Sequence, residues 1–262
     1  MSDLVAGSAI VTGAGSGIGR AVALALSMRG APVGLMDVLP DGLAELAAAV
    51  KQQGGRVATA QADVSRWEDV DRAVDALERD LGPTGILVNA AGILDGYAPA
   101  DELSPSVWER VIAINLSGTF YCAKRVLPGM LARGVGRIIN IGSVASVVGS
   151  GGGPAYTASK HGVLGITRQL AITYADRGVT VNAIGPGAVA TGLRANSTRI
   201  LGPEAPPMRG VGGDESAVRA LTPAGRRGTA EEMAACVAFL ASVDAAYVNG
   251  HLLVADGGWT AR

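Results

Sequence analysis

Residues 9–19 read Ala9-Ile10-Val11-Thr12-Gly13-Ala14-Gly15-Ser16-Gly17-Ile18-Gly19, a short apolar run that leads into a glycine-rich turn. The apolar run predicts a buried strand, and the residues that follow the turn predict a helix. Glycines here let the backbone approach a pyrophosphate at the positive end of the helix. The stretch therefore indicates a nucleotide cradle, although tight strand–helix packing or S-adenosylmethionine binding uses similar turns.

Similar apolar runs recur along the chain and alternate with longer helical patterns. They predict seven strands, at residues 9–11, 33–36, 57–60, 86–88, 137–141, 179–182 and 251–254. Runs that are apolar throughout fit parallel strands buried on both faces. We expect an α/β fold, a doubly wound (Rossmann) parallel seven-stranded sheet with helices on both faces and ligands at the carboxyl ends of the strands.

Three helix starts are readable from local spacing. Ser65 with Glu68, and Thr229 with Glu232, have the separation of a capping box. Ser104 precedes a proline, which is typical of an N-cap followed by the first helical position.

Composition limits the classes of partner. With 262 residues and 48% hydrophobic content, the chain predicts one dinucleotide-binding and catalytic domain over residues 1–262. A net charge of −1 without a dense basic run argues against nucleic acid and favours a small-molecule partner. Cys122 and Cys236 form neither a disulfide framework nor a metal motif, and we expect no metal. With no signal peptide and no membrane span visible, we expect a cytoplasmic protein.

Two segments interrupt the regular pattern. Residues 191–227 are rich in Gly, Pro, Arg and Ala, and follow the sixth predicted strand on the ligand side. We interpret them as a loop that forms a substrate lid, with a disordered insert as the alternative. Residues 149–153 contain four glycines and form a second candidate for a mobile loop.

Tyr156 and Lys160 stand four residues apart, which places them on one face of a helix. A lysine ammonium beside a phenol favours the phenolate, so the pair is typical of acid–base chemistry. An exposed helix pair is the alternative interpretation. Because the chain has only five Tyr and three Lys, chance explains the spacing poorly.

Several polar residues stand at predicted strand ends. Asp37 ends the second strand, where a carboxylate binds ribose hydroxyls and repels a 2′-phosphate, which favours NAD over NADP; a turn cap is the alternative. Asn89 and Gly92 bound a turn that leaves room for a ligand. Ser143 follows the fifth strand and could donate to a substrate oxygen, or simply form a turn. Asn115, inside the apolar helix after Ser104, is on its own more typical of a buried structural amide.

Taken together and in this order, these motifs resemble the short-chain dehydrogenase/reductase family. The resemblance runs from about Ser8 to Gly258 and includes Pro186-Gly187, Thr191 and Asp256-Gly257-Gly258. It departs from the family at Ala90, where many relatives have a second Asn, and at Gly142, where Ser is frequent. Both departures affect fine positioning and not the reacting groups.

The resemblance implies a role for each matching position. Tyr156 would be the general acid/base, Lys160 would hold the nicotinamide ribose, Ser143 would orient the substrate oxygen, and Asn115 would anchor a relay water. The implied cofactor-binding set is Gly13, Ser16, Gly17, Ile18, Gly19, Asp37, Asp63, Val64, Asn89, Ala90, Gly92, Tyr156, Lys160, Pro186, Gly187, Val189 and Thr191. It also implies a homo-oligomer, commonly a tetramer.

We therefore expect an NAD-dependent oxidoreductase that transfers a hydride between nicotinamide and a secondary alcohol or ketone. The alternatives are an NADP-dependent 3-oxoacyl thioester reductase, a non-catalytic nucleotide-sensing protein of the same fold, and a methyltransferase, which has no use for the Tyr156/Lys160 pair. The sequence does not identify the alcohol.

Overall fold

The computed structural model describes residues 3–149, 151–210 and 213–261. Within them, strands that form one sheet are β1 (Ser8–Thr12), β2 (Val33–Asp37), β3 (Val57–Gln61), β4 (Thr84–Asn89), β5 (Gly136–Ile141), β6 (Val179–Pro186) and β7 (Leu252–Ala255). Their order is β3-β2-β1-β4-β5-β6-β7 and every neighbouring pair is parallel. The predicted doubly wound seven-stranded sheet is thus confirmed.

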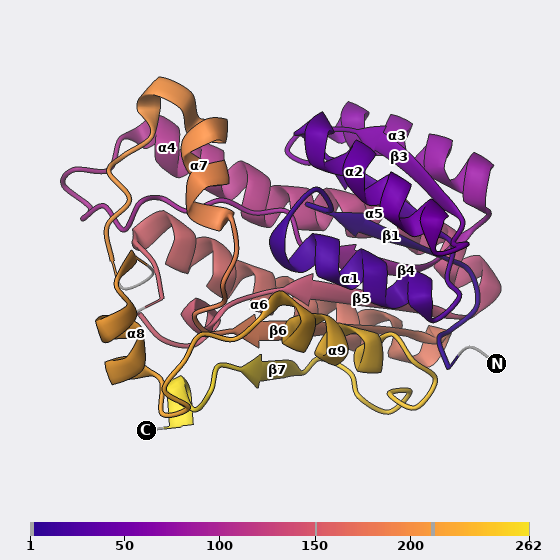
Figure 1. The fold of residues 1–262 in the computed structure, drawn as a ribbon. Helices are drawn as coiled ribbons and strands as arrows, with labels where there is room; N and C mark the ends of the chain where they lie inside the picture. The colour runs from indigo at the N-terminus through magenta and orange to yellow at the C-terminus, as the bar shows by residue number, and fades with distance from the viewer. Residues whose placement is uncertain (1–2, 150, 211–212, 262) are drawn as a thin grey trace.

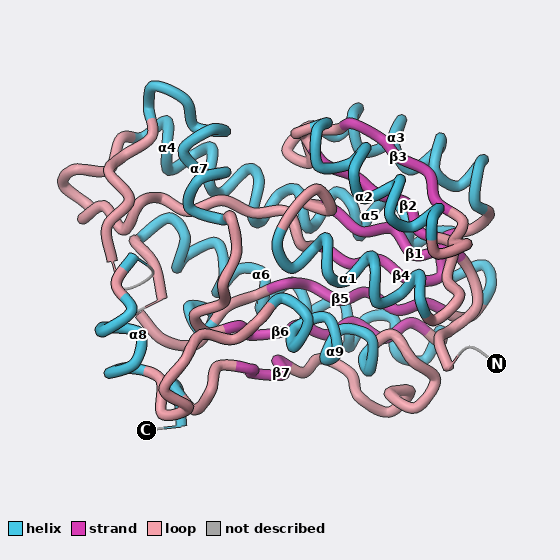
Figure 2. Tube along the Cα trace, viewed as in Figure 1, coloured by secondary structure: helices cyan, strands magenta, loops and turns pink. Residues whose placement is uncertain are grey.

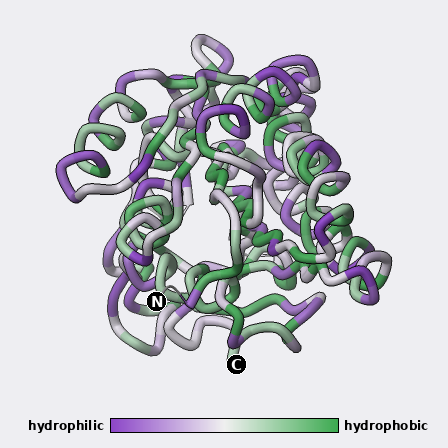
Figure 3. Tube along the Cα trace, turned by 90° about the vertical axis from the view of Figure 1, so that its right-hand side faces the viewer, coloured by the Kyte–Doolittle hydropathy of each residue, from purple (hydrophilic) through white to green (hydrophobic). Residues whose placement is uncertain are grey.

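Helices cover both faces of this sheet (Figures 1 and 2). On one face lie α1 (Gly17–Met28), α2 (Pro40–Gln52) and α9 (Ala230–Leu240), whose apolar residues form one core cluster with the strands. On the other face a second cluster joins α3 (Trp67–Leu81), α4 (Pro105–Ile112), α5 (Gly118–Arg133) and α6 (Pro154–Tyr174). Figure 3 shows the same layering, with hydrophobic segments toward the middle and hydrophilic turns outside.

The sheet reverses its winding between β1 and β4, which are neighbours in space although two strands separate them in sequence. In doubly wound sheets, ligands bind beyond the carboxyl ends of the strands at such a point. The predicted site residues follow this rule, because Gly13, Asp37, Asn89 and Gly187 end or directly follow β1, β2, β4 and β6.

Two of the predicted helix starts are confirmed and one is wrong. Ser104 accepts a hydrogen bond from Val107 N–H, and Thr229 with Glu232 forms a complete capping box. Ser65, in contrast, is not a cap, since α3 begins at Trp67 after Arg66. The Ser65 hydroxyl instead donates to Asp63 Oδ1 at 2.6 Å, so a nearer carboxylate engages it.

Residues 191–227 are more regular than the predicted loop. They contain α7 (Leu193–Leu201) and α8 (Glu215–Leu221), which Figure 1 draws beyond the end of the sheet toward which the β7 arrow points. Residues 211 and 212 of this segment, and residue 150 of the segment 149–153, lie outside the described residues. The disordered-insert interpretation does not fit a segment with two helices packed over the carboxyl edge.

Asn115 does not lie in an ordinary helix. Between α4 and α5 the backbone forms a π-helix, η1 (Ala113–Ser117), and Asn115 is its central residue. Such single-turn bulges occur frequently at functional sites, since they re-aim one side chain without ending the helix.

Candidate active site

The turn between β1 and α1 packs so closely against neighbouring backbone that Gly13 and Gly19 have no room for a side chain. Gly13 has a φ of 64°, and a Cβ on it would lie 2.8 Å from the Ala91 backbone. A Cβ on Gly19 would lie 2.2 Å from the Gly13 carbonyl oxygen. The glycines thus bring the backbone of the turn against the N-terminus of α1, the arrangement that accepts phosphate groups.

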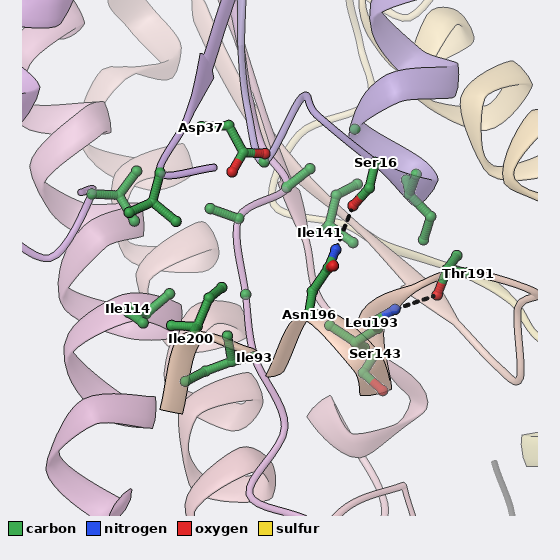
Figure 4. Close-up of a pocket in the computed structure, with 18 of the residues that line it drawn as sticks. Ser16, Asp37, Ile93, Ile114, Ile141, Ser143, Thr191, Leu193, Asn196 and Ile200 are labelled. Atoms are coloured by element: carbon green, nitrogen blue, oxygen red, sulfur yellow. Dashed lines mark hydrogen bonds between the residues drawn. The ribbon is translucent and has the colours of Figure 1, made fainter. Parts of the chain in front are cut away.

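A cavity of about 180 Å³ extends along this turn and the neighbouring strand ends (Figure 4). The predicted residues that line it are Gly13, Ser16, Ile18, Gly19, Asp37, Asp63, Val64, Ala90, Gly92, Ser143, Tyr156, Lys160, Pro186, Gly187, Val189 and Thr191. Figure 4 places Asp37 at one end and Ser143 at the other. We name this space the cofactor cavity.

Three predicted residues do not line the cofactor cavity. A Cβ on Gly17 would lie 3.1 Å from the Thr191 side chain. Asn89 is buried, its Nδ2 donates to Asn140 Oδ1 at 2.9 Å, and its own Oδ1 has no partner. Asn115 accepts a hydrogen bond from Ile93 N–H at 2.8 Å and donates to Ser159 Oγ at 3.1 Å.

Asp37 is held by the backbone on both sides. Its Oδ2 accepts from Gly15 N–H at 2.9 Å, and its Oδ1 accepts from Leu39 N–H at 3.0 Å. These bonds fix a negative charge at the end of the cofactor cavity where β2 ends. The cavity therefore has a carboxylate at a defined position, suited to hydroxyl groups and opposed to a second anion.

One guanidinium lines the cofactor cavity among the described residues, and it is already paired. Arg110 donates to Asp63 Oδ2 and to Ser65 Oγ, both at 2.7 Å. Burial alone would raise the pKa of Asp63, but the hydrogen bonds from Ser65 and Arg110 bring it below its ordinary value. The Arg110 guanidinium is thus already paired with the Asp63 carboxylate.

The structure brings Ser143, Tyr156 and Lys160 together, each less than one-tenth exposed. Ser143 stands just after β5, while Tyr156 and Lys160 lie in the first two turns of α6. The Lys160 ammonium donates to the Ile141 carbonyl at 2.7 Å and lies 5.6 Å from the centre of the Tyr156 ring. A buried phenol, hydroxyl and ammonium therefore share one end of the cofactor cavity.

The pKa of Tyr156 differs from the value expected from the Tyr156/Lys160 spacing alone. Burial raises the pKa of Tyr156 above the usual phenol value; a hydrogen bond with Ser143 opposes the rise, and Tyr97 and Asp95 add to it. Burial also lowers the pKa of Lys160 to about 8. The predicted depression of the Tyr156 pKa is therefore wrong for this structure, because desolvation of the buried phenol is the largest influence on it.

Tyr156 also lines a second cavity, of about 370 Å³. Leu94, Tyr97 and Arg194 line it, and Ser143 and Tyr156 belong to both cavities. We name it the outer cavity. Ser143 and Tyr156 thus lie where the cofactor cavity, beside the glycine-rich turn, meets the outer cavity, which offers a separate space for a second molecule.

Sequence reasoning missed several residues that complete these walls. Asn196 of α7 donates to Ser16 Oγ at 2.8 Å, which ties the segment 191–227 to the glycine-rich turn (Figure 4). Asp95 and Tyr97 lie in the turn after β4; Asp95 accepts a hydrogen bond from Tyr156 N–H, and the Tyr97 hydroxyl donates to the Gly151 carbonyl. No local signal marks Asn196, whereas Asp95 could have been noticed as a carboxylate three residues after Gly92.

A glycine cradle, a carboxylate at one end and a buried tyrosine–lysine pair at the other define a class of dinucleotide-dependent α/β oxidoreductases. The family model for short chain dehydrogenase matches residues 8–200. The chain belongs to the short-chain dehydrogenase family, and it is an oxidoreductase of that type.

Its relatives include alcohol dehydrogenases. The chain is 42% identical to 2-(S)-hydroxypropyl-CoM dehydrogenase 3 of Xanthobacter autotrophicus, covering 96% of this chain and 95% of that protein. The crystal structure of levodione reductase superposes with a TM-score of 0.88, at 37% identity and with 100% and 99% of the two chains covered. The crystal structure of a gluconate 5-dehydrogenase from Burkholderia cenocepacia, solved with NADP and tartrate, superposes with a TM-score of 0.87 at 33% identity. The match covers 100% of this chain and 98% of that chain.

Among the described residues, no helix is both long and apolar enough to cross a membrane.

Proposed function

We propose that this protein is an NAD-dependent dehydrogenase that interconverts a secondary alcohol and its ketone. One observation carries the proposal: Ser143 and Tyr156 line both cavities, so a carbinol in the outer cavity would meet their hydroxyls beside the cofactor cavity. The residues present fit a nicotinamide dinucleotide, because the turn at Gly13 and Gly19 leaves only backbone at the phosphate position. When bound there, the nicotinamide supplies the hydride acceptor or donor.

The chain's own residues divide the remaining chemistry. In alcohol oxidation Tyr156 Oη takes the carbinol O–H proton, while the C–H bond breaks and its electron pair leaves with the hydrogen as hydride. The Ser143 hydroxyl orients the carbinol oxygen. The Lys160 ammonium, with one hydrogen bond to Ile141, keeps a positive charge near the developing alkoxide. Ketone reduction reverses each step.

Asp37 supports NAD over NADP. Its carboxylate is held by two backbone N–H groups at the end of the cofactor cavity, and would repel a 2′-phosphate. The one described guanidinium that lines this cavity, Arg110, is engaged by Asp63. The gluconate 5-dehydrogenase named above was solved with NADP, and the ratio of turnover with NAD to turnover with NADP tests the choice proposed for this chain.

Residues 191–227 act, in this proposal, as the substrate lid. Leu193 and Met208 pack against the small apolar cluster that contains Leu94 and Tyr156, so the segment covers the reacting groups. Closure of such a segment excludes water from a hydride-transfer site. Amide hydrogen exchange over the segment should therefore slow when NAD and a substrate analogue bind; equal exchange in both states would contradict the lid.

The charges of the outer cavity favour substrates that carry a carboxylate. Its charged lining residues are Arg194, Arg227 and Glu215, and Glu215 accepts a hydrogen bond from Arg227. Arg194 donates to the carbonyls of Met208 and Arg209 and forms no ion pair within the described ranges. Its charge is thus uncompensated, which suits an anionic group on the alcohol, such as the acid group of a hydroxy acid.

We further propose a homo-oligomer in the cytoplasm. Trp108 on α4, Phe120 on α5 and Phe239 on α9 are more than two-fifths exposed, as expected of helices that meet a second copy. Cys122 and Cys236 are both free, which fits a reducing compartment. Light scattering coupled to gel filtration measures the assembly, and a monomer at all concentrations would contradict it.

The activity is tested by following NADH absorbance with a panel of secondary alcohols, including cyclic alcohols, steroids and hydroxy acids, and with the matching ketones and NADH. We expect turnover with at least one alcohol and faster turnover with NAD than with NADP. A preference for 3-oxoacyl thioesters with NADPH would favour the reductase alternative. Cofactor binding without turnover on any compound would favour a nucleotide sensor.

A further inference from the structure

The turn after β4, residues 94–97, reaches the helix that carries Tyr156. Asp95 is fully buried, and its carboxylate accepts N–H groups from Gly153 at 3.1 Å and from Tyr156 at 2.9 Å. A third N–H, that of Tyr97, donates to the same carboxylate at 3.2 Å. One side chain therefore connects a strand-end turn to the backbone of Tyr156, 61 residues later.

This contact supplies a cap that α6 lacks locally. The N-cap residue of α6 is Gly153, which has no side chain to accept the N–H groups of the first turn. Asp95 takes this role from a distant part of the chain, and its negative charge faces the positive end of the helix. Tyr156 is the third residue of α6, so its backbone position depends directly on this cap.

A second anchor acts from the same turn. The Tyr97 hydroxyl donates to the Gly151 carbonyl at 2.9 Å, in the segment that leads into α6. Tyr97 is also the one described non-glycine residue with a positive φ, 57°. Backbone strain of this kind persists only where surrounding contacts enforce it, and it concentrates at functional sites.

The turn is also in contact with the segment 191–227. Arg209 N–H donates to the Gly96 carbonyl at 2.9 Å, and Leu94 N–H donates to Ser197 Oγ of α7, also at 2.9 Å. A Cβ on Gly210 would lie 2.6 Å from the Tyr97 ring, so the backbone at this residue packs closely against that ring. Residues 94–97 thus lie between the segment that covers the outer cavity and the helix that carries Tyr156.

We propose that Asp95 is a positioning residue for Tyr156: its carboxylate holds the first turn of α6 so that the phenol meets Ser143, with Tyr97 as a second anchor through Gly151. The proposal rests on the proposed dehydrogenase function. Asp95 lines neither cavity, so it acts through the helix and not on the substrate. A misplacement of the reacting group by about 1 Å lowers the rate on the order of 10²-fold, so loss of the Asp95 contact is expected to lower kcat by up to that factor.

The first test is Asp95→Asn, which keeps the side-chain volume but presents an NH₂ group to at least one of the N–H donors. Its matched control is Ser104→Ala, which also removes a helix cap, on α4 and away from both cavities. We expect kcat to fall roughly 10- to 10²-fold in Asp95→Asn while the Kd for NAD stays near the wild-type value. Ser104→Ala should keep the wild-type kcat per folded molecule.

The pH profile separates positioning from general stabilisation. The titratable and charged groups around the Tyr156 phenol are Lys160 on α6, Asp95 and Tyr97 on the turn, and, in the lining of the outer cavity, Arg194, Arg227 and Glu215. Removing the Asp95 charge lowers the pKa of Tyr156, so the rise of alcohol oxidation with pH should move to lower pH in Asp95→Asn. A wild-type kcat together with an unmoved pH profile would overturn the proposal.

Tyr97→Phe keeps the proposal falsifiable if Asp95→Asn does not fold. It removes only the hydroxyl that donates to Gly151, and we expect a smaller loss of kcat than in Asp95→Asn; an unchanged kcat in a folded Tyr97→Phe protein would then overturn the proposal.

If the wild-type protein oxidises no alcohol, the proposed function fails separately. Amide exchange then decides: it must quicken at Gly153 and Tyr156 in Asp95→Asn and not in Ser104→Ala, and equal exchange overturns the positioning role.

Discussion

The two cavities that meet at Tyr156 are built by different physical means. The phosphate end of the cofactor cavity is formed by backbone: strand ends, glycines without room for a Cβ, and the N-terminus of α1. The outer cavity is lined by side chains from distant parts of the chain, among them Tyr97, Arg194 and Trp259. A backbone-built site serves one shared ligand, whereas a wall of side chains can change with the substrate.

The largest expected effect lies where the two cavities meet. Tyr156→Phe removes only the phenolic hydroxyl and leaves the backbone-built phosphate end of the cofactor cavity intact. We expect turnover to fall by about 10² to 10⁴-fold, the usual contribution of a general acid–base group, while NAD still binds. Steady-state kinetics and a fluorescence titration of cofactor binding measure the two quantities, with Tyr174→Phe, on the far end of α6, as the control. Near-wild-type turnover in a folded Tyr156→Phe protein would refute the proton-transfer role.

A smaller effect is expected at the other end of the cofactor cavity. Asp37→Ala removes the carboxylate that opposes a 2′-phosphate, so the preference for NAD over NADP should decrease by about tenfold, or ~1.4 kcal/mol. The ratio of kcat/KM for the two cofactors is the measurement, and kcat with saturating NAD should change little. If the wild-type protein binds NADPH more tightly than NADH, the assignment of Asp37 to the ribose is wrong.

The smallest effect is expected on the outer cavity. Arg194→Gln removes the uncompensated charge and should raise the KM for a carboxylate-bearing alcohol by up to about fivefold, as for a partly exposed ion pair worth ~1 kcal/mol or less. The KM for a neutral cyclic alcohol serves as the matched control and should stay constant. Equal changes for both alcohols would mean that Arg194 acts by supporting residues 208 and 209 and not by recognising charge.

The contrast between the two cavities also explains how much of the fold and of the site the sequence alone predicts. The seven strands and the glycine-rich turn are local patterns, so the sheet and most of the cofactor cavity follow from short stretches. Contacts such as Asn196 with Ser16 span 180 residues and leave no local pattern. The same limit explains the wrong expectation for the Tyr156 pKa, because the Lys160 spacing is visible in sequence while burial of the phenol is a property of the assembled core.

The most direct test of the account is the pH dependence of hydride transfer in both directions. The measurement is kcat/KM between about pH 6 and pH 10, using an alcohol deuterated at the carbinol carbon to verify that hydride transfer limits the rate. Because burial raises the pKa of Tyr156 above the usual phenol value, the small deprotonated fraction grows with pH, so alcohol oxidation should increase throughout this range. Ketone reduction uses the protonated phenol, which stays fully populated, and should change little. An oxidation rate that is independent of pH while the isotope effect is fully expressed would contradict proton transfer through Tyr156.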